Sequence, residues 1–296
     1  MNPPPIGLIG IGLLGSALAE RLSSAQFHLV GYDLNQAAQE TLNQLGGTVA
    51  GSPREVVQQT DRFILCLPIS SISQQVIDEI EPVLAERHTI IDVTTGHPEE
   101  MEAMGARLAR KGVSYLDATV GGSSQQTRDH QATVMVGVEP EVLTANQDLF
   151  DVIARQTFHV GPCGAGARMK LVVNLVLGLN RAVLAEGLAF ASHYGFDLEQ
   201  SLEILKAGPS YSLAMDIKGE KMIKEQFQPQ ARLAQHLKDV RLILDVADKQ
   251  ELELPLSQVH RQLLESVEAL GFGTSDNSAV IKAYHIKPPE TDSSTP

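Results

Sequence analysis

The feature that most constrains the fold of this chain is a change of pattern near residue 165. Before it, short apolar runs of β-strand type alternate with amphipathic stretches; the runs are 6–10, 28–33, 62–67, 88–93, 114–119 and 132–137. Such alternation predicts parallel βαβ units in a doubly wound, Rossmann-like sheet, and therefore an α/β fold class. After residue 165 no such run occurs, and the pattern predicts helices.

The second half opens with the stretch ARMKLVVNLVLGLNRAVLAEGLAFASHYG, which predicts one long helix over about 165–194 that Gly195 ends as a C-cap. Its length exceeds the usual range and is typical of a helix that links two domains. Further helices are predicted over 197–207, 212–224, 230–250 and 255–270. We therefore predict a dinucleotide-binding domain (1–163), an all-helical domain (164–285) and a disordered, proline-rich tail (286–296).

Composition and charge exclude several classes of protein. The chain has 296 residues, 43% of them hydrophobic, with a formal net charge of -13 and no run of Lys or Arg. Duplex nucleic-acid binders carry a basic patch, so we expect no nucleic-acid partner. Isolated cysteines at 66 and 163 indicate a reduced, cytoplasmic protein. No uninterrupted apolar stretch of about 20 residues is present, and the N-terminus lacks a signal-peptide pattern, so no membrane segment is expected.

A glycine-rich motif predicts where a dinucleotide binds. Gly10, Gly12 and Gly15 form GxGxxG between a predicted strand and a predicted helix that begins at Leu13 and Leu14. In that setting the glycines allow a tight turn and close approach of a pyrophosphate to the helix N-terminus.

Asp33 follows the second predicted strand, at the distance where an acidic residue binds the ribose of NAD. Its carboxylate would accept a hydrogen bond from the 2′-hydroxyl and repel a 2′-phosphate. No Lys or Arg occurs between Arg21 and Arg54, although a 2′-phosphate calls for a nearby cation. The sequence therefore predicts NAD in preference to NADP.

Four motifs in order resemble the β-hydroxyacid dehydrogenases, a family that includes 3-hydroxyisobutyrate dehydrogenase and semialdehyde reductases. They are IGLIGIGLLGSALAERL, DATVGGSSQQTRDHQATVMVG, GPCGAGARMKLVVN and LAQHLKDVRL. The resemblance extends to about residue 285. It implies a Rossmann-like domain, a long linking helix and a helical domain through which the chain forms a homodimer or homotetramer.

The resemblance also implies roles for individual residues. Lys170 is the catalytic lysine and Asn174 its asparagine partner. The substrate-binding motif D-A-P-V-S-G-G falls on residues 117–123, which assigns Gly121, Gly122 and Ser123 to the substrate together with the catalytic pair. The residues assigned to the cofactor, besides the glycine motif, Leu13, Leu14 and Asp33, are Leu67, Pro68, Thr95 and Lys238.

The match has departures. Thr119 stands where the family has proline, Gly121 where it has serine, and Ser123 where it has glycine. A hydroxyl expected at 121 is missing, while Ser123 supplies one nearby. These changes bear on the identity of the substrate and leave the type of reaction unchanged. No histidine has the spacing of a metal ligand, so no metal site is predicted.

Lys170 and Asn174 are four residues apart and share one face of the predicted helix. Hydride transfer from an alcohol needs a base for the hydroxyl proton, and the reverse reaction needs an acid. A partly desolvated lysine can serve in both directions, and an asparagine can orient the oxygen without adding charge. The helix pattern equally allows Lys170 to extend to the surface. Lys238 has the same alternative, that of a solvated side chain.

The sequence as a whole predicts an oxidoreductase that transfers hydride between a nicotinamide cofactor and a small 3-hydroxy acid or semialdehyde acid. One alternative is an imine reductase on the same fold, although those enzymes usually lack a lysine at the position of Lys170. Others are a non-catalytic nucleotide-binding regulator and a decarboxylating enzyme of the 6-phosphogluconate type. The sequence does not choose among hydroxyisobutyrate, tartronate semialdehyde, succinic semialdehyde and glyoxylate.

Overall fold

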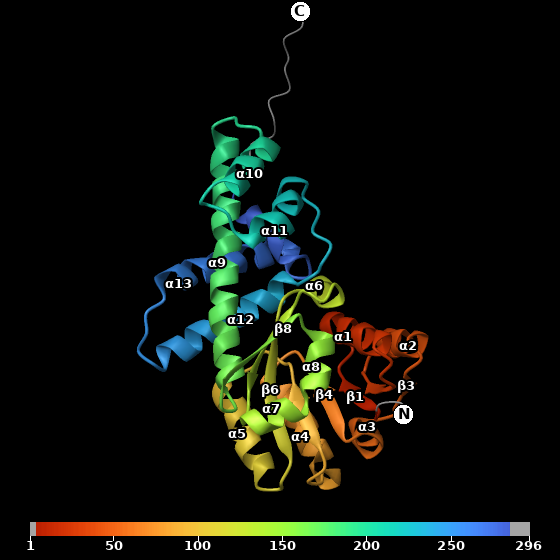
Figure 1. Ribbon diagram of the computed structural model, residues 1–296. Helices are drawn as coiled ribbons and strands as arrows, with labels where there is room; N and C mark the ends of the chain where they lie inside the picture. Colours follow the sequence, from red (N-terminus) through yellow and green to blue (C-terminus); the bar gives the residue numbers. More distant parts are fainter. Residues whose placement is uncertain (1–3, 285–296) are drawn as a thin grey trace, which may run out of the picture. The chain divides into compact units, whose positions relative to one another are not determined.

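The computed structural model describes residues 4–284, and these fall into two compact units (Figure 1). The first unit is Met1–Val172 and the second is Val173–Pro296. The division lies inside helix α9 (Ala165–His193), which therefore contributes its first turns to one unit and the rest to the other. The tail predicted to be disordered, 286–296, lies outside the described residues.

The described part of the first unit is built on an eight-stranded sheet of order β3-β2-β1-β4-β5-β6-β7-β8. The strands are β1 (Ile6–Ile9), β2 (Leu29–Tyr32), β3 (Thr48–Val49), β4 (Arg62–Leu65), β5 (Thr89–Asp92), β6 (Ser114–Gly121), β7 (Thr133–Gly137) and β8 (Gln156–Gly161). Alternate residues of the central strands enter two separate cores: Leu8 and Ile64 pack on one face, Ile9 and Leu65 on the other. Both faces are buried, which explains why these strands read as continuous apolar runs.

Helices cover both faces of the sheet. One core holds side chains of α1 (Leu13–Ser24), α2 (Gln36–Gln44), α7 (Pro140–Ala145) and α8 (Gln147–Ile153), and α6 (Ser124–Arg128) packs against α1. The other core holds side chains of α3 (Pro53–Gln59), α4 (Ser70–Ile80) and α5 (Pro98–Ala109). A short 3₁₀ turn, η1 (Glu81–Val83), follows α4. The predicted doubly wound α/β architecture is confirmed.

The sheet differs from the prediction in two respects. Strand β7 pairs antiparallel with β6, because the connection between them (122–132) is shorter than the dozen or so residues that a parallel crossover takes. Strands β3 and β8 were not predicted. β3 is only two residues long, and β8 is largely exposed, so neither gives an apolar run.

The described part of the second unit is helical, as predicted. After α9 come α10 (Leu198–Ala207), α11 (Leu213–Ile223), α12 (Leu233–Asp248) and α13 (Pro255–Val267), followed by a π-helical turn, η2 (Glu268–Phe272), and a 3₁₀ helix, η3 (Asn277–Ala283). Gly195 has φ +78°, and Phe196 N–H donates to the carbonyl of Ala191 at 3.1 Å. This is the predicted glycine C-cap of α9.

Asp276 ties several segments of the second unit together. Its fully buried carboxylate accepts from Lys218 Nζ at 2.8 and 3.0 Å, from Gln230 N–H at 2.9 Å and from the hydroxyl of Ser278 at 2.8 Å. Burial by itself raises the pKa of Asp276, but the charge of Lys218 and these hydrogen bonds outweigh it and bring the pKa to about 2. The pair is therefore charged at neutral pH.

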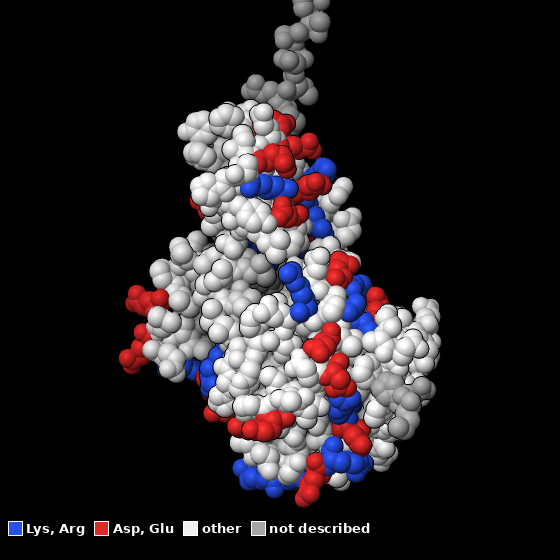
Figure 2. Space-filling view, in the orientation of Figure 1, with Lys and Arg blue, Asp and Glu red and all other residues white. Residues whose placement is uncertain are grey.

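Helix α9 is the one described helix long and apolar enough to cross a membrane, with a mean hydropathy of 1.5 over its most apolar 18 residues. Buried core helices have the same properties, and α9 buries four polar residues, Lys170, Asn174, Arg181 and Ser192. Its exposed side carries Val176, Val183 and Phe190, which are 52%, 67% and 66% exposed at seven-residue spacing. On the face in Figure 2, acidic and basic side chains are interspersed.

Candidate active site

The carboxyl ends of the parallel strands meet at one edge of the sheet. Ile9 lies beside Tyr32 on one side and Leu65 on the other, and Leu65 lies beside Asp92. The order of the strands reverses at β1, since β2 lies on one side of it and β4 on the other. Crevices at such a switch point are where doubly wound sheets bind nucleotides. The structure therefore gathers the loops that carry the glycine motif, Asp33, Leu67, Pro68 and Thr95 along one edge.

The three motif glycines have different physical roles. A Cβ at Gly10, which has φ +96°, would lie 2.3 Å from the carbonyl oxygen of Cys66, and one at Gly15 would lie 2.1 Å from that of Gly10. These two glycines are needed for the fold. Gly12, the N-cap of α1, has no atom within 4 Å of a Cβ position. It leaves the N-terminus of α1 open to the close approach of a phosphate.

Asp33 braces the same turn. Its Oδ2 accepts from Ile11 N–H at 2.6 Å, and its Oδ1 accepts from Asn35 N–H at 2.8 Å. A carboxylate has about four lone-pair sites, so it keeps acceptor capacity for a ribose hydroxyl. The next residue, Leu34, is 91% exposed and offers no cation to a 2′-phosphate.

Thr94, which the sequence analysis missed, joins the loops after β4 and β5. Its buried hydroxyl oxygen accepts from Leu67 N–H at 3.0 Å and lies 3.2 Å from the hydroxyl of Ser73. Thr95 beside it is half-buried, and Pro68 is exposed. Thr94 therefore sets the position of the two loops to which the cofactor residues Leu67, Pro68 and Thr95 belong.

The loop predicted to bind the substrate follows β6. A Cβ at Gly121 would lie 2.7 Å from Thr133 Oγ1, so the hydroxyl of Thr133 occupies the space into which a serine at 121 would extend. Sequence reasoning missed Thr133, because the pairing of Gly121 with Thr133 is set by the antiparallel register of β6 and β7. Ser123 caps α6: its N–H donates to Gln126 Oε1 at 2.9 Å, and its Oγ accepts from Gln126 N–H at 3.2 Å. No described residue accepts the hydroxyl hydrogen of Ser123.

Lys170 reaches this loop from α9. Its Nζ donates to the carbonyl oxygen of Val120 at 2.6 Å, and the residue is 8% exposed. The alternative in which Lys170 extends to the surface is therefore excluded. Because Val120 immediately precedes Gly121, the ammonium lies beside the predicted substrate loop. A buried ammonium destabilises the folded protein unless hydrogen-bond acceptors surround it. The carbonyl of Val120 is such an acceptor.

The first turn of α9 is fastened to β6, which holds Lys170 in place. Asp117 Oδ2 accepts from Ala167 N–H at 2.9 Å, and the hydroxyl of Thr119 donates to the carbonyl of Gly166 at 2.9 Å. A Cβ at Gly166 would lie 2.4 Å from the carbonyl oxygen of Asp117, so the helix approaches the strand closely. Burial raises the pKa of Asp117 to about 7, against the lowering effect of these backbone N–H groups. Thr119, where the family has proline, thus has a structural role.

Asn174 lies one turn after Lys170 on the same face of α9. Its Nδ2 donates to Asp239 Oδ2 at 2.9 Å, and Asp239 Oδ1 lies 2.7 Å from Lys238 Nζ. These three residues lie in the second unit. Asp239 therefore holds both the Lys238 ammonium and the Asn174 amide.

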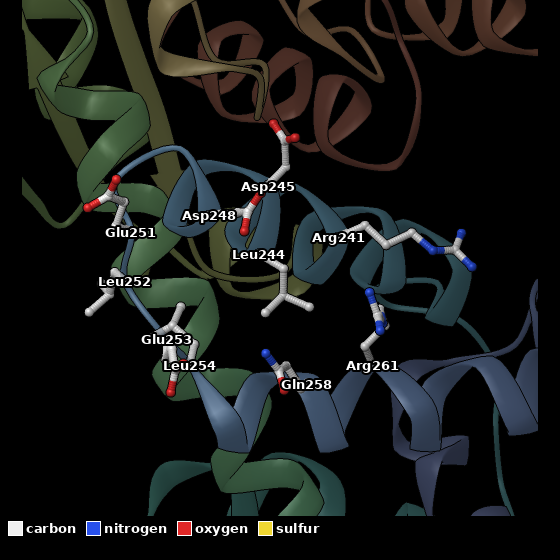
Figure 3. Close-up of a pocket in the computed structure, with 10 residues that line it drawn as sticks. All are labelled: Arg241, Leu244, Asp245, Asp248, Glu251, Leu252, Glu253, Leu254, Gln258 and Arg261. Carbon is white, nitrogen blue, oxygen red and sulfur yellow. The ribbon is translucent and has the colours of Figure 1, made fainter.

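A hollow of about 680 Å³ in the second unit contains none of the predicted site residues (Figure 3). It lies along α12, the following loop and α13, with Asp245, Asp248 and Glu253 among its acidic residues and Arg241 and Arg261 as its basic ones. The residues that line this hollow are mostly polar and carry charges of both signs, and they do not form a recognisable set of catalytic groups.

The two cysteines are half-buried. Burial raises the pKa of both thiols, Cys66 and Cys163, to about 12, so neither is a thiolate nucleophile at neutral pH.

Comparisons with known proteins agree with a dinucleotide-binding first unit followed by a helical second unit. Residues 5–161 match the NAD binding domain of 6-phosphogluconate dehydrogenase, and residues 164–284 match the NAD-binding domain of NADP-dependent 3-hydroxyisobutyrate dehydrogenase. The chain is 31% identical to 2-(hydroxymethyl)glutarate dehydrogenase of Eubacterium barkeri, over 94% of each chain. It is 27% identical to glyoxylate/succinic semialdehyde reductase 1 of Arabidopsis thaliana, over 94% of this chain and 97% of the relative. The crystal structure of 3-hydroxyisobutyrate dehydrogenase from Salmonella typhimurium shares the fold, with a TM-score of 0.87 at 23% identity, over 95% of this chain and all (100%) of that one.

The open space at Gly12 leads to a prediction. Gly12→Ala should leave the melting temperature nearly unchanged, because its Cβ meets no protein atom. It should weaken dinucleotide binding about tenfold or more, a loss of about 1.4 kcal/mol, because the methyl group would occupy the approach to the phosphates. Titration of NADH fluorescence measures the affinity. Gly15→Ala is the contrasting variant and should destabilise the protein; unchanged NADH affinity in Gly12→Ala would contradict this assignment.

Proposed function

The chain belongs to the β-hydroxyacid dehydrogenase family, and from that premise we propose that it interconverts a small 3-hydroxy acid and the corresponding semialdehyde acid by hydride transfer. One observation carries the proposal. The buried ammonium of Lys170 lies next to the loop after β6, where the family places the substrate.

The residues of the first unit fit a nicotinamide dinucleotide. Gly12 leaves the N-terminus of α1 open for the pyrophosphate, and Asp33 keeps acceptor capacity for the ribose. When bound, the nicotinamide donates or accepts the hydride. The protein's contribution is to align the reacting groups and to handle the proton.

Lys170 is the proposed general acid and base. In the direction of reduction, Nζ donates a proton to the carbonyl oxygen as negative charge develops there; in the direction of oxidation, it accepts the proton of the hydroxyl group. Its bond to the Val120 carbonyl holds Nζ in one position. Asn174 orients the same oxygen without adding charge, and Asp239 holds its amide.

The substrate carboxylate would be held by the backbone at Gly121 and Gly122 and by the hydroxyl of Ser123, whose hydrogen no described residue accepts. Thr133 supports the same loop, because its hydroxyl donates to the carbonyl of Gly121 at 3.4 Å. The Ser123 hydroxyl is an uncharged donor, so it would bind the carboxylate in the acid and in the semialdehyde alike.

The first test removes the proposed acid and base. Lys170→Met keeps the apolar stem and should lower kcat by about 10²- to 10⁴-fold, the usual contribution of general acid–base catalysis. NADH binding, followed by fluorescence, should persist because Lys170 is not assigned to the cofactor. Lys224→Met, at an exposed lysine of the second unit, is the control and should leave kcat unchanged. Near-normal turnover of Lys170→Met would refute the assignment, and cofactor binding without turnover in the wild type would favour a non-catalytic regulator.

We further propose that NAD is preferred over NADP, on the support of Asp33 and of the lack of Lys or Arg in the sequence between Arg21 and Arg54. The wild type should show a higher kcat/KM with NADH than with NADPH. In the double variant Asp33→Ser/Leu34→Arg, the ratio of the two should move towards NADPH by about tenfold or more, which corresponds to about 1.4 kcal/mol. Steady-state kinetics with both cofactors decides the matter, and a wild type that prefers NADPH would show the proposal to be wrong.

We also propose that the helical unit mediates assembly into a homodimer or homotetramer. The support is the exposed apolar side of α9, where Val176, Val183 and Phe190 follow a seven-residue spacing typical of helix–helix seams. A second copy of the chain offers the same face in return. Light scattering should find an oligomer for the wild type and a monomer for Val183→Glu/Phe190→Glu. A monomeric wild type at micromolar concentration would contradict this.

A further inference from the structure

Asp92 is a buried carboxyl group that none of the proposed steps uses. It is the last residue of β5, at the edge where the carboxyl ends of the parallel strands meet, and it is 0% exposed. Burial raises its pKa, although hydrogen bonds from Thr94, Tyr115 and Ser73 act in the opposite direction. An apolar side chain would avoid the cost of burying a carboxyl group, which points to a role other than stability.

Tyr115 reaches Asp92 from the neighbouring strand β6. Its hydroxyl donates to Asp92 Oδ2 at 2.9 Å and also lies 3.3 Å from the sulfur of Met101. Tyr115 is 5% exposed, and burial, followed by the charge of Asp92, raises its pKa well above the usual value. The phenol therefore keeps its hydrogen at neutral pH and acts as a constant donor to the carboxyl group.

Thr94 connects the carboxyl group of Asp92 to the loops after β4 and β5. Asp92 Oδ1 accepts from Thr94 N–H at 2.9 Å, and the Thr94 hydroxyl also hydrogen-bonds to Asp92. The oxygen of that hydroxyl accepts from Leu67 N–H at 3.0 Å, in the loop after β4. One buried carboxyl group thus fixes the backbone of both loops.

The loop after β5 has a second attachment on the other side of Thr95. The hydroxyl of Ser70, in the first turn of α4, accepts from His97 N–H at 3.0 Å and donates to Glu100 Oε2 at 2.5 Å. A Cβ at Gly96 would lie 2.3 Å from Cβ of Ser70, so the loop packs tightly on α4. Thr95, which is assigned to the cofactor, is therefore held from both sides.

The order of the strands indicates which part of a dinucleotide these loops would meet. The glycine motif follows β1 and Asp33 follows β2, so the pyrophosphate would lie at β1 and the adenosine ribose on the β2 side of it. Strands β4 and β5 lie on the other side of β1. The remaining part of the cofactor, the nicotinamide riboside, would then lie against the loops that Asp92 holds.

We propose that Asp92 and Tyr115 are positioning residues, which hold the loops after β4 and β5 in the arrangement that receives the nicotinamide half of the cofactor. This inference rests on the dinucleotide site of the proposed function and does not depend on its chemical step. Both side chains are buried, so they act through the backbone of Thr94 and Leu67. Loops that are already ordered lose less conformational entropy when a ligand binds, which strengthens binding.

The test compares the binding of NADH with that of ADP, which has the adenosine and the pyrophosphate and lacks the nicotinamide riboside. Tyr115→Phe removes one oxygen atom and keeps the ring. It should weaken NADH binding by about fivefold or more, the size expected for one hydrogen bond, and leave ADP binding unchanged. Thr94→Val should have the same selective effect, and Thr94→Ser, which keeps the hydroxyl, should restore the affinity of the wild type. Isothermal titration calorimetry measures both ligands.

Thr60→Val is the matched control. Thr60 is also buried, and its hydroxyl donates to the carbonyl of Val56 at 2.9 Å, just before β4 begins at the opposite edge of the sheet. This variant should keep the wild-type affinity for both ligands, whatever its melting temperature.

An equal loss of NADH and ADP binding in Tyr115→Phe and Thr94→Val would show that the network only stabilises the fold, and would overturn the proposal. Unchanged NADH affinity in these variants would overturn it as well. If NADH binding depends on Tyr115 in this way but the wild type oxidises no hydroxy acid, the positioning role stands and the dehydrogenase assignment fails.

Discussion

The bond from Lys170 Nζ to the carbonyl of Val120 is the interaction on which the candidate site depends. It places a buried ammonium at the end of β6, and the first turn of α9 must be held against the same strand for the bond to form. Asp117 and Thr119 supply that attachment through the backbone of Ala167 and Gly166. The reactive group is therefore positioned by a strand, a helix N-terminus and a glycine that allows them to approach, all within one unit.

Helix α9 combines two requirements that usually conflict. Its composition is apolar enough for a buried helix, yet one face presents Lys170, Asn174 and Arg181 in succession. Two of these polar groups have partners of different kinds: Lys170 donates to a backbone carbonyl, and Asn174 donates to the carboxylate of Asp239. Nη2 of Arg181 has no hydrogen-bond acceptor among the described residues. Natural proteins tolerate such costs at functional sites, because polar groups already held in place need not be reorganised when substrate binds.

The parts of the structure that local pattern controls were predictable. The strands of the parallel sheet, the run of helices after residue 165 and the glycine cap at Gly195 all follow from periodicity and backbone freedom. The departures have physical causes as well. Strand β7 pairs antiparallel with β6 because the connection between them is short. Strand β8 was not predicted, because an exposed edge strand needs no apolar run. Thr94 and Thr133 could not be found, since an isolated threonine has no distinguishing signal in a sequence.

The sequence by itself determined the architecture, the dinucleotide motif and the pairing of Lys170 with Asn174 on one helix face, because spacing along a helix or around a turn is a local property. Tertiary structure decided what those side chains meet. The acceptor for Lys170, the carboxylate that holds Asn174 and the threonine hydroxyl beside Gly121 all come from segments distant in the chain. Their meeting depends on register and helix packing, which no single stretch of residues specifies.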